Sequence, residues 1–283
     1  MARRRILMKK AFLETTAINH ALFNSANGRK LREELQSKGY SPVVGIHVVY
    51  ELARTFLNPK DFETGQRLFA IVRDLDPSYS PPPVKLFEQE VLKLKTGSAV
   101  LPFLDYLGQA SMRTEVHRLA MGNFDDKARR FIERRESEIK LEHPRNDQAY
   151  LAHIQDVRSD QGAQNAKLRT FEDVLTYFQP QIPDAIHQRL QGSITRSEAN
   201  ELVQRLDSFL AIRSAVRADV YLNFICIVHK DTPGFDKIDD YRHVIESSYC
   251  DVIITGDRQL YRSANRINPD IEVVSCNDIF KYR

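Results

Sequence analysis

The chain has few cysteines and lacks the common zinc-binding motifs. Cys226, Cys250 and Cys276 are far apart, and neither a C-x-x-C pair nor an H-E-x-x-H sequence occurs. We therefore expect no disulfide framework, and a reducing cytoplasm is the expected location. Cys226 and Cys250 lie in apolar helical segments and are predicted to be buried small hydrophobic residues.

Long apolar runs and a strong excess of one charge are also missing. No stretch approaches membrane-spanning length, and the apolar run in the basic segment 1–10 is too short for a signal peptide. The formal net charge of +3 over 283 residues permits a nucleic-acid partner without demanding one. With 28% charged and 42% hydrophobic residues, the composition is that of an ordinary globular protein, and no membrane partner is expected.

A short apolar strand that runs into an aspartate is the most informative feature of the sequence. The apolar residues 252–254 are followed by Thr255-Gly256-Asp257 and then by a helical pattern. Such runs are typical of interior strands of a parallel sheet. Because α/β sheets bind ligands at the carboxyl ends of their strands, Asp257 is a candidate site residue. Thr255 either orders this site by hydrogen bonding or satisfies the turn.

A second aspartate precedes this strand by one helix. We expect a helix from Asp240 to Tyr249 that rises about 15 Å, and a strand from Asp251 to Gly256 that returns about 17 Å. If the two pack antiparallel, these lengths bring Asp257 back to the end where Asp240 begins and leave Asp251 at the opposite end. Asp240 and Asp257 are therefore predicted neighbours, although Asp240 alone would be read as a helix cap.

Two glutamates lie in comparable positions. A strand is expected over Lys10 to Glu14, so that Glu14 ends a strand as Asp257 does. Glu51 lies within residues 43–53, a run that we expect to be helical and apolar on nearly all sides. A carboxylate there is costly to bury unless a cation or donor meets it. Four such acids suggest a hard divalent cation, Mg²⁺ or Mn²⁺, and hydrolysis of phosphodiesters.

The middle of the chain differs from its two ends. The proline-rich segment 76–83 reads as a linker, and from there to residue 229 helical periodicity replaces strand patterns, with the longest expected helix at 197–228. Residues 128–142 are expected to form a highly charged helix, and residues 159–165 a mobile loop. The predicted organisation is a doubly wound α/β domain over residues 8–80 and 230–283, with a mostly helical insertion or subdomain over residues 84–229.

The early acids resemble those of the PIN domain, a family of metal-dependent nucleases with a doubly wound α/β fold and a parallel sheet. In that family a first strand ends in an acid followed by threonine and a small polar residue, matched here by Glu14-Thr15-Thr16. A glutamate inside the second or third helix is matched by Glu51. The resemblance covers about residues 8–75 and 220–280.

The late block is the strongest part of this resemblance. In a variant of the family pattern, an acid opens a helix as Asp-x-x-His and is followed by Cys-Asp and Thr-x-Asp. The sequence reads Asp240-Tyr241-Arg242-His243, Cys250-Asp251 and Thr255-Gly256-Asp257. His243 alone is interpreted as a packing residue without a catalytic role.

The resemblance implies an endoribonuclease that cuts single-stranded RNA and leaves 5′-phosphate and 3′-hydroxyl ends. The resemblance favours RNA over DNA as the substrate. By family analogy only, it also implies a homodimer and allows for an inhibitory protein partner. Asp236 and Asp239 lie near enough to Asp240 to replace it as a ligand. The implied metal-binding and catalytic residues are Glu14, Glu51, Asp240 and Asp257, with Thr15, Thr255 and Asp239 as supporting residues and Mg²⁺ or Mn²⁺ as cofactor.

Two alternatives stay open. The family usually has aspartate where this chain has Glu14, which favours a catalytically silent module that binds RNA or a protein through its helical block. A nuclease that acts on branched or single-stranded DNA differs only in its substrate.

Overall fold

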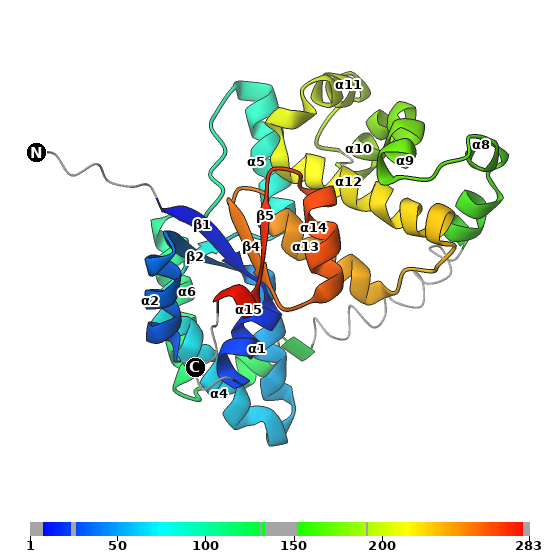
Figure 1. Ribbon diagram of the computed structural model, residues 1–283. Coiled ribbons are helices and arrows are strands. Elements are labelled where there is room, and N and C mark those ends of the chain that lie inside the picture. The colour runs from blue at the N-terminus through cyan, green and yellow to red at the C-terminus, as the bar shows by residue number, and fades with distance from the viewer. Residues whose placement is uncertain (1–7, 24–26, 131, 134–151, 191, 280–283) are drawn as a thin grey trace, which may run out of the picture.

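A computed structural model describes residues 8–23, 27–130, 132–133, 152–190 and 192–279 of the chain (Figure 1). Its centre is a five-stranded sheet in which each neighbouring pair of strands is parallel. The spatial order is β3-β2-β1-β4-β5, so the chain moves outward from β1 to one edge and then returns to the other side of β1. This confirms the expected α/β class. The strands are β1 (Lys9–Leu13), β2 (Tyr40–Gly45), β3 (Ser78–Ser80), β4 (Val252–Thr255) and β5 (Glu272–Ser275).

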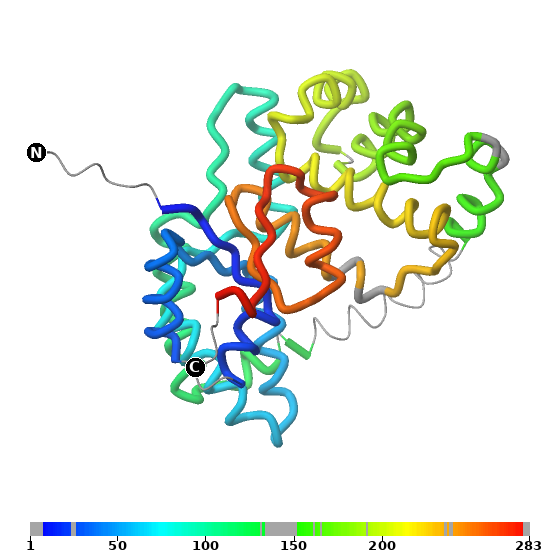
Figure 2. Tube along the Cα trace, in the orientation of Figure 1, coloured from blue at the N-terminus to red at the C-terminus, as the bar shows by residue number. Residues whose placement is uncertain are grey.

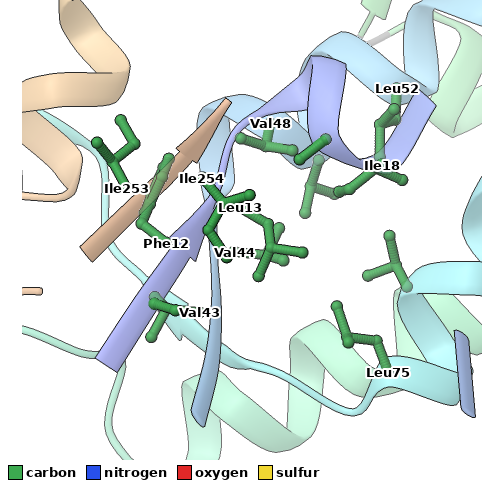
Figure 3. Packing of buried hydrophobic residues seen from close by; sticks show 14 of the residues in the cluster. Phe12, Leu13, Ile18, Val43, Val44, Val48, Leu52, Leu75, Ile253 and Ile254 are labelled. Carbon is green, nitrogen blue, oxygen red and sulfur yellow. The ribbon is translucent and has the colours of Figure 1, made fainter. Parts of the chain in front are cut away.

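The two central strands are apolar because both of their faces are covered. In β1, Phe12 is aligned with Val43 of β2 on one side and with Ile253 of β4 on the other. Phe12, Leu13 and the apolar residues of β4 are buried in one core (Figure 3). A parallel sheet with two covered faces selects such continuous apolar strands, which explains why residues 252–254 stand out in the sequence.

Helices cover both faces of the sheet. The right-handed crossovers that connect parallel strands place helices on opposite faces when the direction of travel reverses. In agreement, α4 contacts both α1 and α2, and α12, α13 and α14 contact one another. The helices nearest the sheet are α1 (Thr15–Phe23), α2 (Gly28–Ser37), α3 (Ile46–Ala53), α4 (Phe62–Leu75), α13 (Phe235–Glu246), α14 (Arg258–Ile267) and α15 (Cys276–Ile279).

The described residues between 84 and 229 contain helices and no strand. Helix α12 is the centre of this block and packs against α5, α9 and α10 as well as against α13 and α14. The Cα trace shows this block beside the β4–α14–β5 segment (Figure 2). Helix α6 is different, because it packs against α4 and β3 and joins the core around the sheet. The helices are α5 (Pro83–Thr96), α6 (Tyr106–Ala120), α8 (Gln161–Asn165), α9 (Phe171–Phe178), α10 (Ile182–Arg189), α11 (Arg196–Gln204) and α12 (Leu210–Phe224), followed by a π-helix (Ile225–His229).

Two strands of the sheet were not predicted. Residues 43–45, expected to be helical, are the buried end of β2, because a short β-branched apolar run does not distinguish a buried strand from a helix. The expected linker 76–83 contains β3, whose three residues pair with residues 43–45 at the edge of the sheet. Prolines flank β3, and the last of them, Pro83, begins α5.

Several helix boundaries also differ from expectation. The expected helix 197–228 is interrupted after α11 by a 3-10 turn at Leu206–Ser208. The expected loop 159–165 contains α8, capped by the Asp160 carboxylate. Helix α13 begins at Phe235, so Asp240 lies in its second turn instead of opening it. Most of the expected charged helix 128–142 lies outside the described residues.

The cysteines and the search for membrane spans agree with the sequence analysis. Cys226, Cys250 and Cys276 are free and buried, which confirms the prediction for the first two. Within the described part of the chain, no helix has both the length and the apolar character needed to cross a membrane.

Candidate functional site

The candidate site lies at the carboxyl edge of the sheet, between β1 and β4. The strand order reverses between these two strands, and such switch points are where α/β sheets bind ligands. Glu14 directly follows β1 and Thr255 ends β4, and the Thr255 hydroxyl donates a hydrogen bond to Glu14 Oε2 (3.1 Å). The Gly256 N–H donates to Thr16 Oγ1 (2.7 Å). The two strand ends are therefore fastened together.

Glu14 is almost completely buried and has one oxygen with several donors. Besides Thr255, Glu14 Oε2 accepts hydrogen bonds from the N–H (3.0 Å) and the hydroxyl of Thr16. Glu14 Oε1 faces the imidazole of His243, with 3.9 Å between Oε1 and Nε2. The turn after β1 thus fixes the carboxylate and aims one oxygen at helix α13.

Glu51, on helix α3, lies between two imidazoles. Its Oε2 is 3.2 Å from His243 Nε2, and its Oε1 is 3.4 Å from His47 Nε2, one turn earlier on the same helix. The Thr15 hydroxyl also donates a hydrogen bond to Glu51 Oε2. Burial opposes ionisation, but the two imidazoles outweigh burial and hold the pKa of Glu51 well below its usual range. Thr15 and Thr255 therefore each donate a hydrogen bond to one of the two glutamates.

His243 is a central residue of this site, contrary to the interpretation of its sequence context. It is buried, with 2% of its surface exposed, and its ring lies 5.2 Å from that of His47. Burial lowers the pKa of His243, but the Glu51 carboxylate and the charges of Glu14 and Glu246 raise it to about 9. The sequence did contain a pattern for these residues. His47 precedes Glu51 by four positions, and His243 follows Asp240 by three, so each pair shares a helix face.

Asp257 lies close enough to Asp240 for its charge to act on it, although α13 begins at Phe235 and not at Asp240 as expected. Burial raises the pKa of Asp240 to about 6; Lys237, whose Nζ is 3.4 Å from Asp240 Oδ2, opposes the rise, and the charge of Asp257 adds to it. Asp257 caps α14, with Oδ1 accepting the N–H groups of residues 259 and 260 (2.6 and 2.7 Å). Asp251 lies before β4, at the opposite edge, and accepts the Lys10 N–H (2.6 Å).

The tightest group of potential metal ligands is not the predicted set of four carboxylates. In the part of the chain that the structure describes, three or more such side chains come together only at His47, Glu51 and His243, whose ligand atoms all lie within 4.8 Å of one another. Glu14 borders this trio, and the charge of His243 also acts on Asp240. The side chains of Asp236 and Asp239 lie outside the described residues.

Glu246 extends the cluster one turn further along α13. It is buried, and its Oε1 accepts the His47 N–H (3.3 Å), while Oε2 has no hydrogen-bond partner. Burial raises the pKa of Glu246 to about 8, although the charge of His243 opposes the rise. A side chain at Gly45 would collide with Glu246 Oε2, so glycine is required there for this carboxylate to fit.

A groove with a volume of 1150 Å³ adjoins Asp240. Its walls come from α9, α12 and the π-helix on one side and from α13 and α14 on the other, and they include the rings of Tyr221 and Tyr261. Three exposed arginines at intervals of four residues form a stripe along α14, which begins directly after Asp257. The wall contains both cationic and acidic residues, and Arg258 at the start of the stripe lies next to it in sequence. The cationic residues are Arg169, Lys237, Arg262 and Arg266, and the acidic residues are Glu172, Asp231 and Asp240.

Comparisons with known proteins leave the family open. The chain matches no protein-family model, and searches of the curated proteins and of the solved structures found no match. The resemblance to the PIN domain therefore stays an interpretation of the motif residues.

Proposed function

We propose that the chain is a divalent-metal-dependent phosphodiester hydrolase, and specifically an endoribonuclease that cuts single-stranded RNA. The observation that supports this proposal is that two of four proposed carboxylate ligands follow the strands on either side of the switch point, and that a third lines a groove with several cationic side chains. Parallel sheets bind ligands at this edge. The carboxylates are Glu14, Glu51, Asp240 and Asp257.

The donor set fits Mg²⁺ or Mn²⁺, which prefer carboxylate oxygens with the remaining positions left to water and phosphate. The hydrogen bonds from Thr16 and Thr255 go to Glu14 Oε2, and Oε1 accepts neither of them. Asp240 is buried enough for its pKa to rise to about 6, and a cation beside it would offset the cost of ionisation. When bound, the metal would lower the pKa of a water and neutralise charge on the phosphate oxygens.

The groove is suited to a single-stranded polyanion. The arginines of α14 would contact phosphates along the strand, starting next to the capping residue Asp257. Tyr261, whose side chain is 44% exposed, offers a ring on which a base can stack. These contacts do not depend on base sequence, so we expect weak sequence preference and a strong effect of salt on binding.

Cleavage of end-labelled oligonucleotides by the full chain tests this proposal. We expect cuts within single-stranded RNA in Mn²⁺ or Mg²⁺, none in chelator, and 5′-phosphate and 3′-hydroxyl ends. Asp257→Asn should abolish cleavage, whereas the matched control Asp251→Asn, at the opposite edge of the sheet, should not. Side-by-side assays with branched and single-stranded DNA identify the substrate. Activity in chelator, or an Asp257→Asn variant as active as the wild type, would contradict the proposal.

One observation favours a second candidate, a catalytically silent module that binds RNA. Glu14, which stands where the resembling family has aspartate, is held by hydrogen bonds from Thr16 and Thr255 and is 5% exposed, as a structural carboxylate would be. Under this alternative the arginine stripe still binds RNA. Tight RNA binding in chelator, with no cleavage on addition of Mn²⁺, would support the module over the enzyme.

A further inference from the structure

Two imidazoles and a carboxylate converge beside the predicted acids. His47 Nε2 is 3.4 Å from Glu51 Oε1, and His243 Nε2 is 3.2 Å from Glu51 Oε2. The three residues come from α3 and α13, two helices that contact each other directly. The trio is therefore built on packed helices and not on loops.

These separations match those between ligands of one tetrahedral metal ion. Bonds of about 2.0–2.2 Å from zinc to nitrogen and oxygen place neighbouring ligand atoms roughly 3.4 Å apart. The two separations, 3.4 and 3.2 Å, are close to this value but involve different oxygens of Glu51, and one ligand atom from each of the three residues lies within 4.8 Å of the others. An ion between the imidazoles thus requires only a small approach of the side chains.

Hydrogen bonding leaves part of the trio unsatisfied. His47 Nε2 is buried and has no hydrogen-bond partner, because its short separation from Glu51 Oε1 lacks hydrogen-bond geometry. Buried polar atoms are otherwise almost always paired. By contrast, Thr15 holds the Glu51 carboxylate through a hydrogen bond, as outer residues do for metal ligands. His47 also lines a cavity of 590 Å³ beside the trio.

We propose that His47, Glu51 and His243 form a binding site for a transition-metal ion of the Zn²⁺ type, with Glu14 Oε1 placed to serve as a fourth ligand. Imidazole nitrogens select such ions, whereas Mg²⁺ selects oxygen ligands. Two histidines and a glutamate are a ligand set of catalytic zinc sites, which keep a further position for water or substrate. This site shares Glu14 and Glu51 with the proposed nuclease site, but metal binding here does not require nuclease activity.

Titration of the untagged full chain with Co²⁺ tests the proposal, because tetrahedral Co²⁺ absorbs visible light strongly and can be displaced by Zn²⁺. We expect one tightly bound Co²⁺ per chain, displaced by Zn²⁺ but not by excess Mg²⁺. Loss of a direct ligand exceeds the 10–100-fold effect of an outer residue. His47→Phe, which keeps a ring of similar size, should therefore weaken Co²⁺ binding by more than about 100-fold.

A control separates this site from its surroundings. His117→Phe removes an exposed histidine on α6 and should leave Co²⁺ binding unchanged. Circular dichroism and thermal unfolding show whether His47→Phe folds, and His243→Phe is the second variant. The proposal is overturned if no stoichiometric Co²⁺ binds, or if folded His47→Phe binds Co²⁺ like the wild type. Because binding is read by absorbance, a chain without nuclease activity can still pass this test.

Discussion

Glu90 is a buried carboxylate of α5 that caps the first turn of a different helix, α12. Its Oε1 accepts hydrogen bonds from the Ala211 N–H (2.8 Å) and the Tyr249 hydroxyl (2.6 Å), and its Oε2 accepts the Ile212 N–H (2.8 Å). Phe209, the N-cap residue of α12, supplies no side-chain cap. We therefore expect Glu90 to hold the helical block against α13 and to contribute strongly to the free energy of unfolding.

The size of this effect follows from the groups that a substitution leaves unpaired. Glu90→Ala leaves two N–H groups and a hydroxyl without their acceptor, at about 1–3 kcal/mol for each buried group, and it also opens a cavity. Removing a buried charge offsets part of this loss, since burial raises the pKa of Glu90 despite its hydrogen bonds. We expect a net loss of about 3–5 kcal/mol for Glu90→Ala. Glu90→Gln keeps the volume and one acceptor oxygen, so about 1–2 kcal/mol is expected.

Urea denaturation at pH 7 measures these losses, and Glu88→Ala is the matched control on the same helix. Glu88 is 56% exposed and pairs with Lys85, so its removal should change the free energy of unfolding by less than about 0.5 kcal/mol. Burial raises the pKa of Glu90 above its ordinary value of 4.5 in the folded state, which means that the folded state binds the proton more tightly. The free energy of unfolding of the wild type therefore falls as the pH rises above 4.5, and its difference from that of Glu90→Gln becomes smaller. The reasoning is refuted if Glu90→Ala costs no more than Glu88→Ala.

Three further predictions test other parts of the structure. Burial raises the pKa of Glu246 from 4.5 to about 8, so the folded wild type binds this proton more tightly and loses stability as the pH rises from 4.5 to 8. Glu246→Gln should flatten this decline, measured in chelator. Parallel pH profiles of the two proteins would contradict this prediction. Gly45→Ala should lower the free energy of unfolding by about 1–3 kcal/mol through overpacking, since its methyl group would collide with Glu246 and lie 2.9 Å from Phe12 Cζ; an unchanged Tm would disprove it. Arg213→Ala should lower the free energy of unfolding by about 2–3 kcal/mol in urea denaturation, because the Arg213 side chain is 7% exposed. Asp270→Asn, which neutralises a 65% exposed partner of Arg213, should lower it by less than about 1 kcal/mol. Equal losses would show that the ion pair, and not packing, dominates.

Strands β1 and β4 could be predicted from the sequence, whereas β2 and the edge strand β3 could not. Residues 252–254 are apolar throughout because both faces of β4 are covered, and that pattern is visible locally. Ser78-Tyr79-Ser80 has prolines on both sides and the composition of a linker. It becomes a strand only because residues 43–45 pair with it, and this partnership depends on contacts more than thirty residues away. Composition alone does not contain that information.

The candidate site was predictable to the same partial degree. The helix expected from Asp240 to Tyr249 begins instead at Phe235 and ends at Glu246, so the lengths of helix and strand indicated only that Asp240 and Asp257 lie in the same region. The ion pair between His243 and Glu51 depends on α3 and α13 facing each other, which is a property of the whole fold. Single histidines on apolar helices are usually packing residues, so His243 became a site candidate only when its partner was known.

Helix α13 places three ionisable side chains, at intervals of three residues, in increasingly buried surroundings. Asp240 borders the groove with 30% of its side chain exposed, His243 is 2% exposed, and Glu246 is 1% exposed. Apolar residues of similar size would stabilise a purely structural helix more, because each buried charge has a desolvation cost. Clusters of perturbed ionisable groups concentrate at functional sites. We therefore interpret this series as part of a binding or catalytic centre. The Co²⁺ titration tests metal binding at His243, and the Asp257→Asn cleavage assay tests metal-dependent catalysis beside Asp240.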